Sequence, residues 1–331
     1  MHRSLFLVAL VIVLACPSVI ARSLDRAEID AFSLQMQKTH GFDAAALREL
    51  LSLATRLDSV LAAISKPAET KPWHEYRAIF VTPERVRGGA KFWVENATDI
   101  DAAFNRFGVP AEIIVAIIGV ETAYGRNAGN YRVLDALGTL AFHYPKRASF
   151  FRTELEQFLL LTREEKVDPV ALKGSYAGAM GIPQFMPSSF RTYAVDFNAD
   201  GHRDIWAKPA DAIGSVANYL QGHGWKPQQP IVLLAAPGEA LASQASETVE
   251  LTKTLADFAH EGVHPTQHAT AELSAVLLAY EGKSSTEYWF GLNNFYVITR
   301  YNRSPKYALA VVQLADAIKD LRASENAPQA Q

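Results

Sequence analysis

The chain has 331 residues, of which 49% are hydrophobic and 20% are charged, with 32 Lys and Arg against 35 Asp and Glu. This ordinary globular composition argues against a disordered, collagen-like or coiled-coil protein. A net charge of -3 supplies no basic field for binding nucleic acid through its phosphates, so we expect no nucleic-acid partner. The single cysteine, Cys16, allows no intramolecular disulfide.

The N-terminus predicts export. An apolar run of eleven residues, LFLVALVIVLA, lies close behind the first methionine. It is shorter than the about 20 residues that a spanning helix needs, and it fits a signal peptide over residues 1–21. Cleavage after Ala21 would release the chain into the periplasm, and we favour this form because Leu14 and Pro17 are unusual beside a lipidation site. The alternative is an outer-membrane lipoprotein anchored through Cys16.

The body of the chain reads as mostly helical. Asp43 is a predicted N-cap, and Pro67 ends the first helical block. Residues 230–251 differ, since their short apolar runs are broken by Pro-Gly and Ser clusters, which is typical of strands and loops. We therefore expect a helical protein with a small β insertion. The predicted helical segments are residues 24–66, 73–108, 271–280 and 307–321.

A carboxylate follows a strongly apolar helix. The segment PAEIIVAIIGVE is apolar nearly all round, so this helix should be buried. Glu121 ends it on the face of three isoleucines, whereas Glu112 lies roughly opposite, so the two acids cannot form a catalytic pair. The following TAYGR breaks the helix and leaves Glu121 near its negative C-terminal end.

Apolar surroundings and the helix dipole both oppose ionisation, so we expect a raised pKa for Glu121. A carboxylic acid that keeps its proton near neutral pH can donate it to a glycosidic oxygen. The alternative is a structural glutamate paired with Arg126 or Arg132.

A segment of small residues, GSYAGAMGIPQFMPSS, spans residues 174–189. Its glycines allow a ligand to approach the backbone closely. Ser175 and Gln184 could hydrogen-bond a sugar, and Met180 and Phe185 offer apolar surface. The spacing alone favours the alternative, a tight turn that leads into a helix capped by Ser188 or Ser189.

The stretch DFNADGHRD resembles the first half of an EF-hand loop. Oxygen ligands stand at loop positions 1, 3, 5 and 9, with glycine at position 6. Position 12 is Ala207, so the usual bidentate ligand is missing, and Asp211 is its candidate replacement. We predict a structural calcium site, with sodium as the alternative ion and an Asx-rich turn without an ion as the alternative structure. The candidate ligands are Asp196, Asn198, Asp200, His202 through its carbonyl, Asp204 and Asp211.

A second metal pattern is disfavoured. The sequence HEGVH from His260 to His264 matches the H-E-x-x-H pattern of zinc proteases, and His268 follows. That pattern needs one continuous helix. Gly262 and Pro265 oppose such a helix, so we expect a polar loop or helix end.

Taken together, the motifs resemble one known family, the lytic murein transglycosylases of the membrane-bound B type (glycoside hydrolase family 103-like). The matching stretches cover most of residues 70–320 in order: GVETAYGR, LDALGTLAFHYPKRASFF, LKGSYAGAMGIPQFMPSSF, YAVDFNADGHRDIW, DAIGSVANYLQGHGW and YWFGLNNFYVITRYNRSPKYA. Lys146 and Arg147 stand where the family has paired arginines. The stretch from Trp206 to Asp211 is one residue longer than the family pattern, which bears on Asp211 as a ligand.

The resemblance implies a mainly α (α+β) fold with a lysozyme-like core domain at residues 109–228. A flanking helical domain at residues 22–108 would be completed by residues 300–323. A small β domain would occupy residues 229–299. We expect a monomer.

The resemblance also implies an activity, cleavage of the β-1,4 bond between N-acetylmuramic acid and N-acetylglucosamine in peptidoglycan with formation of a 1,6-anhydro end. Glu121 falls on the family's acid and base, and no catalytic cofactor is expected. Alternatives are a hydrolytic muramidase of the same fold and a non-catalytic peptidoglycan-binding protein. Proteins of cell-wall synthesis or division are candidate partners beside the glycan strands. Positions that fall on sugar-binding or cleft residues are Ser175, Met180, Gln184, Phe185, Tyr219, Tyr76, Arg147, Tyr301 and Tyr307.

Overall fold

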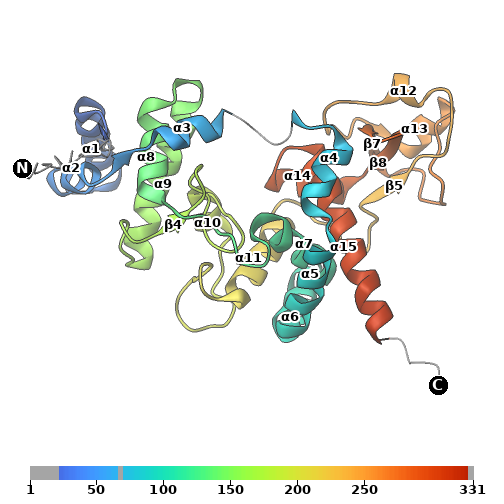
Figure 1. Cartoon of the computed structure of the whole chain (residues 1–331), viewed down its shortest axis with the longest axis horizontal. Helices are drawn as coiled ribbons and strands as arrows, with labels where there is room; N and C mark the ends of the chain where they lie inside the picture. Colours follow the sequence, from blue (N-terminus) through green and yellow to red (C-terminus); the bar gives the residue numbers. More distant parts are fainter. Residues whose placement is uncertain (1–21, 66–69, 327–331) are drawn as a thin grey trace, which may run out of the picture.

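The structure is a computed structural model that describes residues 22–65 and 70–326. The predicted signal peptide with Cys16, and also Pro67, lie outside the described residues. The long axis of the molecule runs from α1 and α2 near the N-terminus to a small sheet at the opposite end (Figure 1).

The N-terminal helices pack on two helices from the middle of the chain. Helix α3 and strand β2 contact α8, and α8 lies along α9. Helix α1 meets α8 through Phe32 and Phe142, whose ring centroids are 5.9 Å apart. Asp43 caps α2 as predicted, accepting from the backbone N–H groups of Ala45 and Ala46 at 2.7 and 3.1 Å. The elements of this region are β1 (Arg22–Ser23), α1 (Arg26–His40), α2 (Ala44–Ser52), β2 (Thr55–Arg56), α3 (Asp58–Ile64), α8 (Val133–His143) and α9 (Ala148–Glu165).

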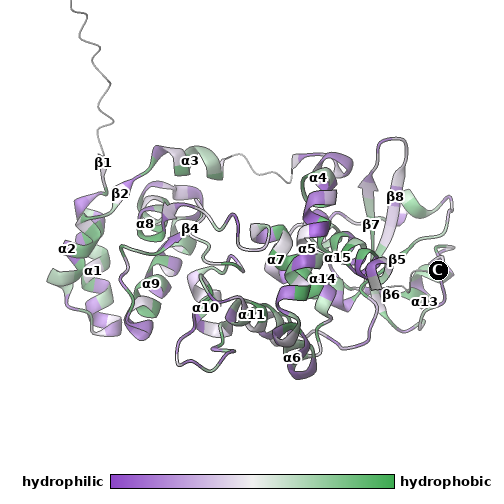
Figure 2. Ribbon diagram, turned by 60° about the horizontal axis from the view of Figure 1, so that its bottom comes forward, coloured by the Kyte–Doolittle hydropathy of each residue, from purple (hydrophilic) through white to green (hydrophobic). Residues whose placement is uncertain are grey.

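The central helices surround α7 (Ala111–Thr122), whose residues Ile113 to Val120 are buried. Helix α15 packs against α4, α5 and α7, and α11 packs against α6 and α7. Helices α11 and α15 show hydrophobic and hydrophilic residues side by side in the middle of the molecule (Figure 2), and buried residues such as Ile213, Val216 and Leu309 contribute to the core. The domain boundaries at residues 108, 228 and 299 stay a prediction. The other central helices are α4 (Trp73–Phe80), α5 (Pro83–Glu95), α6 (Ala97–Phe107), α11 (Pro209–Gly222), α14 (Asn293–Tyr301) and α15 (Pro305–Asn326).

A four-stranded antiparallel sheet in the order β5-β8-β7-β6 forms the small β region. The prediction of a helix at residues 271–280 is wrong, because residues 274–281 form the long strand β7. A short apolar run can fill either a buried strand or a buried helix, and here pairing with β8 decides. The elements are β5 (Val232–Leu234), α12 (Leu241–Gln244), β6 (Lys253–Thr254), α13 (Leu255–His260), β7 (Ser274–Glu281) and β8 (Thr286–Gly291).

The fold is thus mainly helical with a small β part, as predicted. Across residues 22–65 and 70–326, no single helix is both long and apolar enough to cross a membrane. The bent pair α6 and α7 meets the length and composition criteria together. Its second helix, α7, is a buried core helix.

Candidate active site

Glu121 lies in the last turn of α7, on the face of the buried residues Ile114, Ile117 and Ile118. The helix ends at Thr122, and Ala123 and Tyr124 adopt left-handed backbone conformations with φ of 50° and 65°. The predicted helix break is confirmed. Glu112 points to the other side, where it accepts a hydrogen bond from Lys319 at 3.0 Å.

The Glu121 carboxyl is enclosed by protein, although the residue as a whole is only half-buried and stays reachable. Burial raises the pKa of Glu121 to about 7, and a hydrogen bond from Tyr307 opposes this rise. The Tyr307 hydroxyl donates to Oε1 of Glu121 at 2.6 Å. The carboxyl is therefore poised to give and to take a proton near neutral pH.

The alternative of a structural ion pair for Glu121 is wrong. Arg126 pairs with Glu84 at 3.5 Å, and Arg132 pairs with Asp135 at 2.7 Å. Within the described chain no salt bridge reaches Glu121, and no second carboxylate contributes to its pKa shift.

Aromatic side chains from three parts of the chain gather beside Glu121. The rings of Tyr219 and Tyr301 are 4.8 Å apart, and Phe185 lies 5.5 and 5.8 Å from them. Both tyrosine hydroxyls are held by backbone: Tyr301 donates to the Pro183 carbonyl at 2.6 Å, and Tyr219 donates to the Arg300 carbonyl at 2.5 Å. The charge of Glu121 adds to the burial that raises the pKa of both tyrosines, which places them in its neighbourhood.

The loop before α10 (Pro187–Tyr193) folds back on itself and is tied to the end of α7. Met180 and Phe185 exchange backbone hydrogen bonds at 2.8 and 3.0 Å. Thr122 donates its hydroxyl to the Ile182 carbonyl at 2.9 Å. The structure thus brings the predicted sugar-binding segment against the helix end that carries Glu121.

Ser175 and Gln184 also stabilise this loop. The Ser175 hydroxyl oxygen accepts from the N–H groups of Ala177 and Ala179 at 3.2 and 3.1 Å. The Gln184 amide nitrogen donates to the carbonyls of Ala128 and Gly181 at 3.0 and 2.9 Å. The Gln184 side-chain oxygen is not used by these bonds and remains an acceptor for a ligand.

The turn leading into a helix, which was the alternative for this segment, is also present in the structure. Neither Ser188 nor Ser189 caps that helix, however. Helix α10 has Met186 at its N-cap. The missing acceptor comes from Glu154 of α9, which receives the Ser188 N–H at 2.9 Å and the Ser188 hydroxyl at 2.7 Å. No local pattern could reveal a cap that lies 34 residues away in the chain.

Tyr76 and Arg147 differ in how close they come to this group. Tyr76 is buried on α4, and its charge contributes to the raised pKa of Tyr307, so it lies near the Glu121 group. Arg147 is exposed just before α9, with its guanidinium stacked 4.3 Å from the Phe150 ring. None of the contacts described for Arg147 reaches Glu121.

Two residues that the sequence reasoning missed hold the end of α7. Arg85 of α5 donates to the carbonyls of Gly119 and Val120 at 2.6 and 3.2 Å. Tyr124 donates to the Arg85 carbonyl at 2.7 Å. A Cβ at Gly119 would stand 2.5 Å from the Tyr124 hydroxyl oxygen, so this close approach requires glycine.

The adjacent glycines Gly88 and Gly89 of α5 also leave space for the Tyr124 side chain. A Cβ at Gly88 or Gly89 would stand 2.9 or 2.6 Å from Tyr124 atoms. Paired glycines inside a helix lower its stability unless close packing requires them. The glycine pair in the RVRGG segment is therefore a sequence signal of close packing against α5. The turn that follows Glu121 is thereby locked against α5.

The predicted calcium loop is organised by its own carboxylates. Asp196 accepts from the N–H groups of Asp200 and Gly201 at 3.1 and 2.8 Å. Asp211 reaches back into the loop despite the extra residue and accepts from Phe197 and Asp204, each at 2.8 Å. In the described ranges, no three His, Cys, Asp or Glu side chains converge as a metal site.

The chemistry of the loop nevertheless fits a hard cation. Its donors are carboxylate, amide and backbone oxygens, the ligands that calcium prefers. Asp211 is fully buried, and no lysine or arginine is among the described groups that shift its pKa. Burial and the nearby charge of Asp196 raise the pKa of Asp211. An uncompensated buried carboxylate is the kind of group that a bound cation would stabilise.

The H-E-x-x-H pattern does not form a zinc site. Helix α13 ends at His260, and Gly262 has a φ of 78°, so the two histidines do not share a helix. Glu261 instead pairs with Lys253 at 2.7 Å. The expected polar helix end is confirmed.

Comparison with known proteins identifies the family of the chain. Residues 25–316 match the family described as Transglycosylase SLT domain. The chain is 46% identical over 297 residues to the membrane-bound lytic murein transglycosylase B of Escherichia coli (strain K12), covering 86% of this chain and 80% of that protein.

Solved structures show the same fold. Catenated lytic transglycosylase SltB1 from Pseudomonas aeruginosa superposes with a TM-score of 0.86 at 50% identity, covering 89% of this chain and 98% of that one. The Escherichia coli lytic transglycosylase Slt35 in complex with calcium gives a TM-score of 0.84 at 44% identity, covering 93% and 98%. The predicted lysozyme-like architecture is confirmed by these similarities.

Proposed function

The chain belongs to the Transglycosylase SLT domain family, and we propose that it is a peptidoglycan lytic transglycosylase that uses Glu121 as its only acid and base. The observation that carries this proposal is the enclosed Glu121 carboxyl, with a pKa of about 7 and a Tyr307 hydroxyl 2.6 Å from Oε1. Most glycosidases need two carboxylates, whereas this site supplies one.

In the first step the protonated Glu121 donates its proton to the glycosidic oxygen as the bond to the anomeric carbon breaks. The N-acetyl group of the substrate's own muramic acid assists at that carbon, which replaces the missing second carboxylate. The Tyr307 hydrogen bond orients the carboxyl and stabilises the carboxylate that remains.

In the second step the Glu121 carboxylate takes the proton of the C6 hydroxyl. The C6 oxygen then closes on the anomeric carbon, the acetamido group leaves it, and the 1,6-anhydro ring forms without water. Glu121 is protonated again, so the cycle balances. The aromatic group of Phe185, Tyr219 and Tyr301 is suited to shield this carbon from water.

We assign the substrate-binding residues by where they lie relative to Glu121. We assign sugar contacts to Ser175, Met180 and Gln184 in the loop tied to α7. Tyr76 would line the site near Tyr307, and Arg147 would contact more distant parts of the strand or its peptide.

Digestion of purified sacculi, followed by mass spectrometry of the released fragments, tests the proposal. We expect muropeptides with 1,6-anhydro ends. Products heavier by one water would identify a hydrolytic muramidase instead, and bound sacculi without any soluble product would identify a binding protein.

Arg85 is expected to matter for turnover although it does not contact substrate. Arg85→Met removes two hydrogen bonds to the carbonyls just before Glu121, which should cost about 2 kcal/mol of unfolding free energy. The loosened carboxyl should lower kcat about tenfold with little change in KM. Steady-state kinetics and urea unfolding measure both effects.

The matched control is Arg87→Met on the same helix, because Arg87 is exposed. If both variants lose kcat equally, Arg85 has no special role in positioning Glu121.

We further propose that the loop beginning at Asp196 binds a structural calcium ion, as sodium is the weaker candidate for so many carboxylates. Calcium in the Slt35 relative supports this assignment. The candidate ligands are Asp196, Asn198, Asp200, the His202 carbonyl, Asp204 and Asp211. The ion would hold the loop and take no part in the reaction.

Removing calcium should lower the Tm. At a free calcium concentration of about a hundred times the dissociation constant, a bound ion adds about 2.7 kcal/mol to stability. We expect EGTA to lower the Tm by several degrees and excess calcium, but not sodium, to restore it. An unchanged Tm in EGTA would mean that the loop is stable without an ion.

The relative's description as membrane-bound supports a location in the cell envelope. We propose the periplasm, with a lipid anchor at Cys16 as the alternative. Peptidoglycan strands are the proposed partner, and proteins of wall synthesis or division are further candidates.

A further inference from the structure

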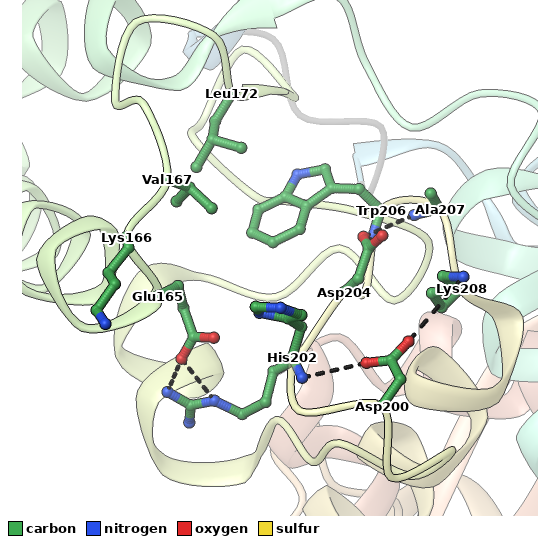
Figure 3. A pocket seen from close by; sticks show the side chains of 11 residues that line it. Glu165, Lys166, Val167, Leu172, Asp200, His202, Asp204, Trp206, Ala207 and Lys208 are labelled. Carbon is green, nitrogen blue, oxygen red and sulfur yellow. Dashed lines mark hydrogen bonds and ion pairs between the residues drawn. The ribbon is translucent and has the colours of Figure 1, made fainter.

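A cavity of about 540 Å³ lies away from Glu121, between the turn that follows α9 and the loop from Asp200 to Lys208. Its volume falls within the range of roughly 300–1,000 Å³ that small-molecule sites occupy. Neither Glu121 nor Ser175 lines it. We call it the Trp206 pocket (Figure 3).

The pocket has a rigid aromatic wall. The Trp206 indole faces Val167 and Leu172 across the opening (Figure 3). Its Nε1–H donates to the Lys173 carbonyl at 3.3 Å, and its ring lies 5.6 Å from that of Phe190. The Trp206 indole is therefore held in place without a ligand. A sugar ring that stacks on it costs little side-chain entropy, because the indole is already ordered.

Fixed polar groups surround this wall. Arg203 donates to Glu165 through Nε at 2.8 Å, and Asp204 accepts from the N–H groups of Trp206 and Ala207 at 3.0 and 2.9 Å. The Glu165 carboxylate held in this way keeps lone pairs for hydroxyl donors of a ligand, since each oxygen accepts more than one hydrogen bond.

The charges of the lining balance. Lys166, Arg203 and Lys208 face the same number of acids, which are Glu165, Asp200 and Asp204. A calcium ion in the loop that begins at Asp196 would keep the balance, because its two charges would offset those of Asp196 and Asp211, which lie outside the lining. Its coordination of Asp200 and Asp204 would leave Glu165 as the acid of the lining that is available to a ligand. A neutral pocket favours an uncharged polar ligand over an anionic peptide or a nucleotide.

Backbone hydrogen bonds connect this pocket to the proposed sugar-binding loop. The Ile182 N–H donates to the Ile205 carbonyl at 2.9 Å, directly before Trp206. Lys173, which holds the indole, lies two residues before Ser175. The pocket is therefore rigidly coupled to the active-site loop although it opens elsewhere.

We infer that the Trp206 pocket is a second saccharide site, in which the apolar face of an N-acetylglucosamine ring stacks on Trp206 and its hydroxyls donate to Glu165. The inference rests on the proposed function, which supplies a polymer rich in this neutral sugar. A site outside the active centre would retain the enzyme on the wall through a second point of attachment.

The test uses tri-N-acetylchitotriose, a neutral N-acetylglucosamine trimer, added to the Glu121→Gln protein and followed by NMR. Trp206→Phe, which keeps a ring against Phe190, assigns the Trp206 indole signal. We expect this signal to shift and saturate. Val167→Tyr and, independently, Leu172→Tyr should fill the pocket and abolish the shift. Val94→Tyr on α5, where Val94 is 63% exposed, is the matched control and should leave the shift unchanged.

The same variants should reduce co-sedimentation with sacculi several-fold, and Val94→Tyr should not. A Trp206 signal that does not move with the trimer overturns the inference, and so does an equal shift in the two filled variants. A shift produced only by a short anionic muramyl peptide would assign the pocket to peptide instead. Because Glu121→Gln is used throughout, a failure of the catalytic proposal leaves these readouts unaffected.

Discussion

Glu121→Gln is expected to lower the rate of anhydro-muropeptide release from sacculi by about 10³-fold, in the middle of the range for general acid–base catalysis. Glutamine has the same shape, and its side-chain oxygen can still accept the Tyr307 hydrogen bond. It can neither donate a proton to the leaving oxygen nor take one from the C6 hydroxyl, so both steps lose their catalyst. Release is measured by chromatography and mass spectrometry.

The chain supplies a close control on the same helix. Glu112→Gln makes the same chemical change on the opposite face of α7, where the carboxylate only pairs with the exposed Lys319. This variant should digest sacculi at nearly the normal rate. Near-normal turnover by Glu121→Gln, with an unchanged circular dichroism spectrum, would remove Glu121 from the mechanism.

The acid could be predicted because its signals are local. An apolar helix that ends in a glutamate and a helix break is visible in seventeen consecutive residues, PAEIIVAIIGVETAYGR. Its hydrogen-bond partner Tyr307 lies 186 residues away, so no spacing rule links them. Only the family resemblance pointed to Tyr307, and the structure supplies the contact.

The same distinction explains the fold. The Asp43 cap was predictable because its acceptor and donors lie within three residues of one another. The helix predicted at residues 271–280 is a strand at residues 274–281 instead, because its partner strand and not its own sequence decides between the two. Likewise, the hydrogen bonds of Arg85 could not be predicted from the sequence, since its acceptors belong to another helix.

The second large effect concerns stability and pH. The unfolded-state pKa of Glu121 is close to the ordinary 4.5, and burial raises the folded-state pKa to about 7. Below pH 4.5 the group is protonated in both states, so its contribution to stability is fully present there. It is lost as the pH rises through about 7, because the folded protein must then hold a buried charge.

The size of this loss follows from the pKa shift. One unit corresponds to 1.36 kcal/mol, so ionisation of Glu121 should cost the folded protein on the order of 3 kcal/mol above pH 7. Glutamine is neutral at every pH and does not pay this cost. Glu121→Gln should therefore be more stable than the unsubstituted protein at pH 8.5. The difference in unfolding free energy between the two proteins should shift in favour of the variant by on the order of 3 kcal/mol between pH 4 and pH 8.5.

Urea unfolding of both proteins at several pH values between 4 and 8.5 measures this difference. Other acids with raised pKa values, Glu154, Asp211 and Asp316, titrate in both proteins and cancel in the comparison. Glu112→Gln should show no such pH-dependent gain, because Lys319 already stabilises that carboxylate. If the two variants behaved alike, the enclosure of Glu121 would not be raising its pKa. The burial that lowers the stability of the protein at high pH also keeps Glu121 protonated near neutral pH, so that it can donate its proton to the glycosidic oxygen.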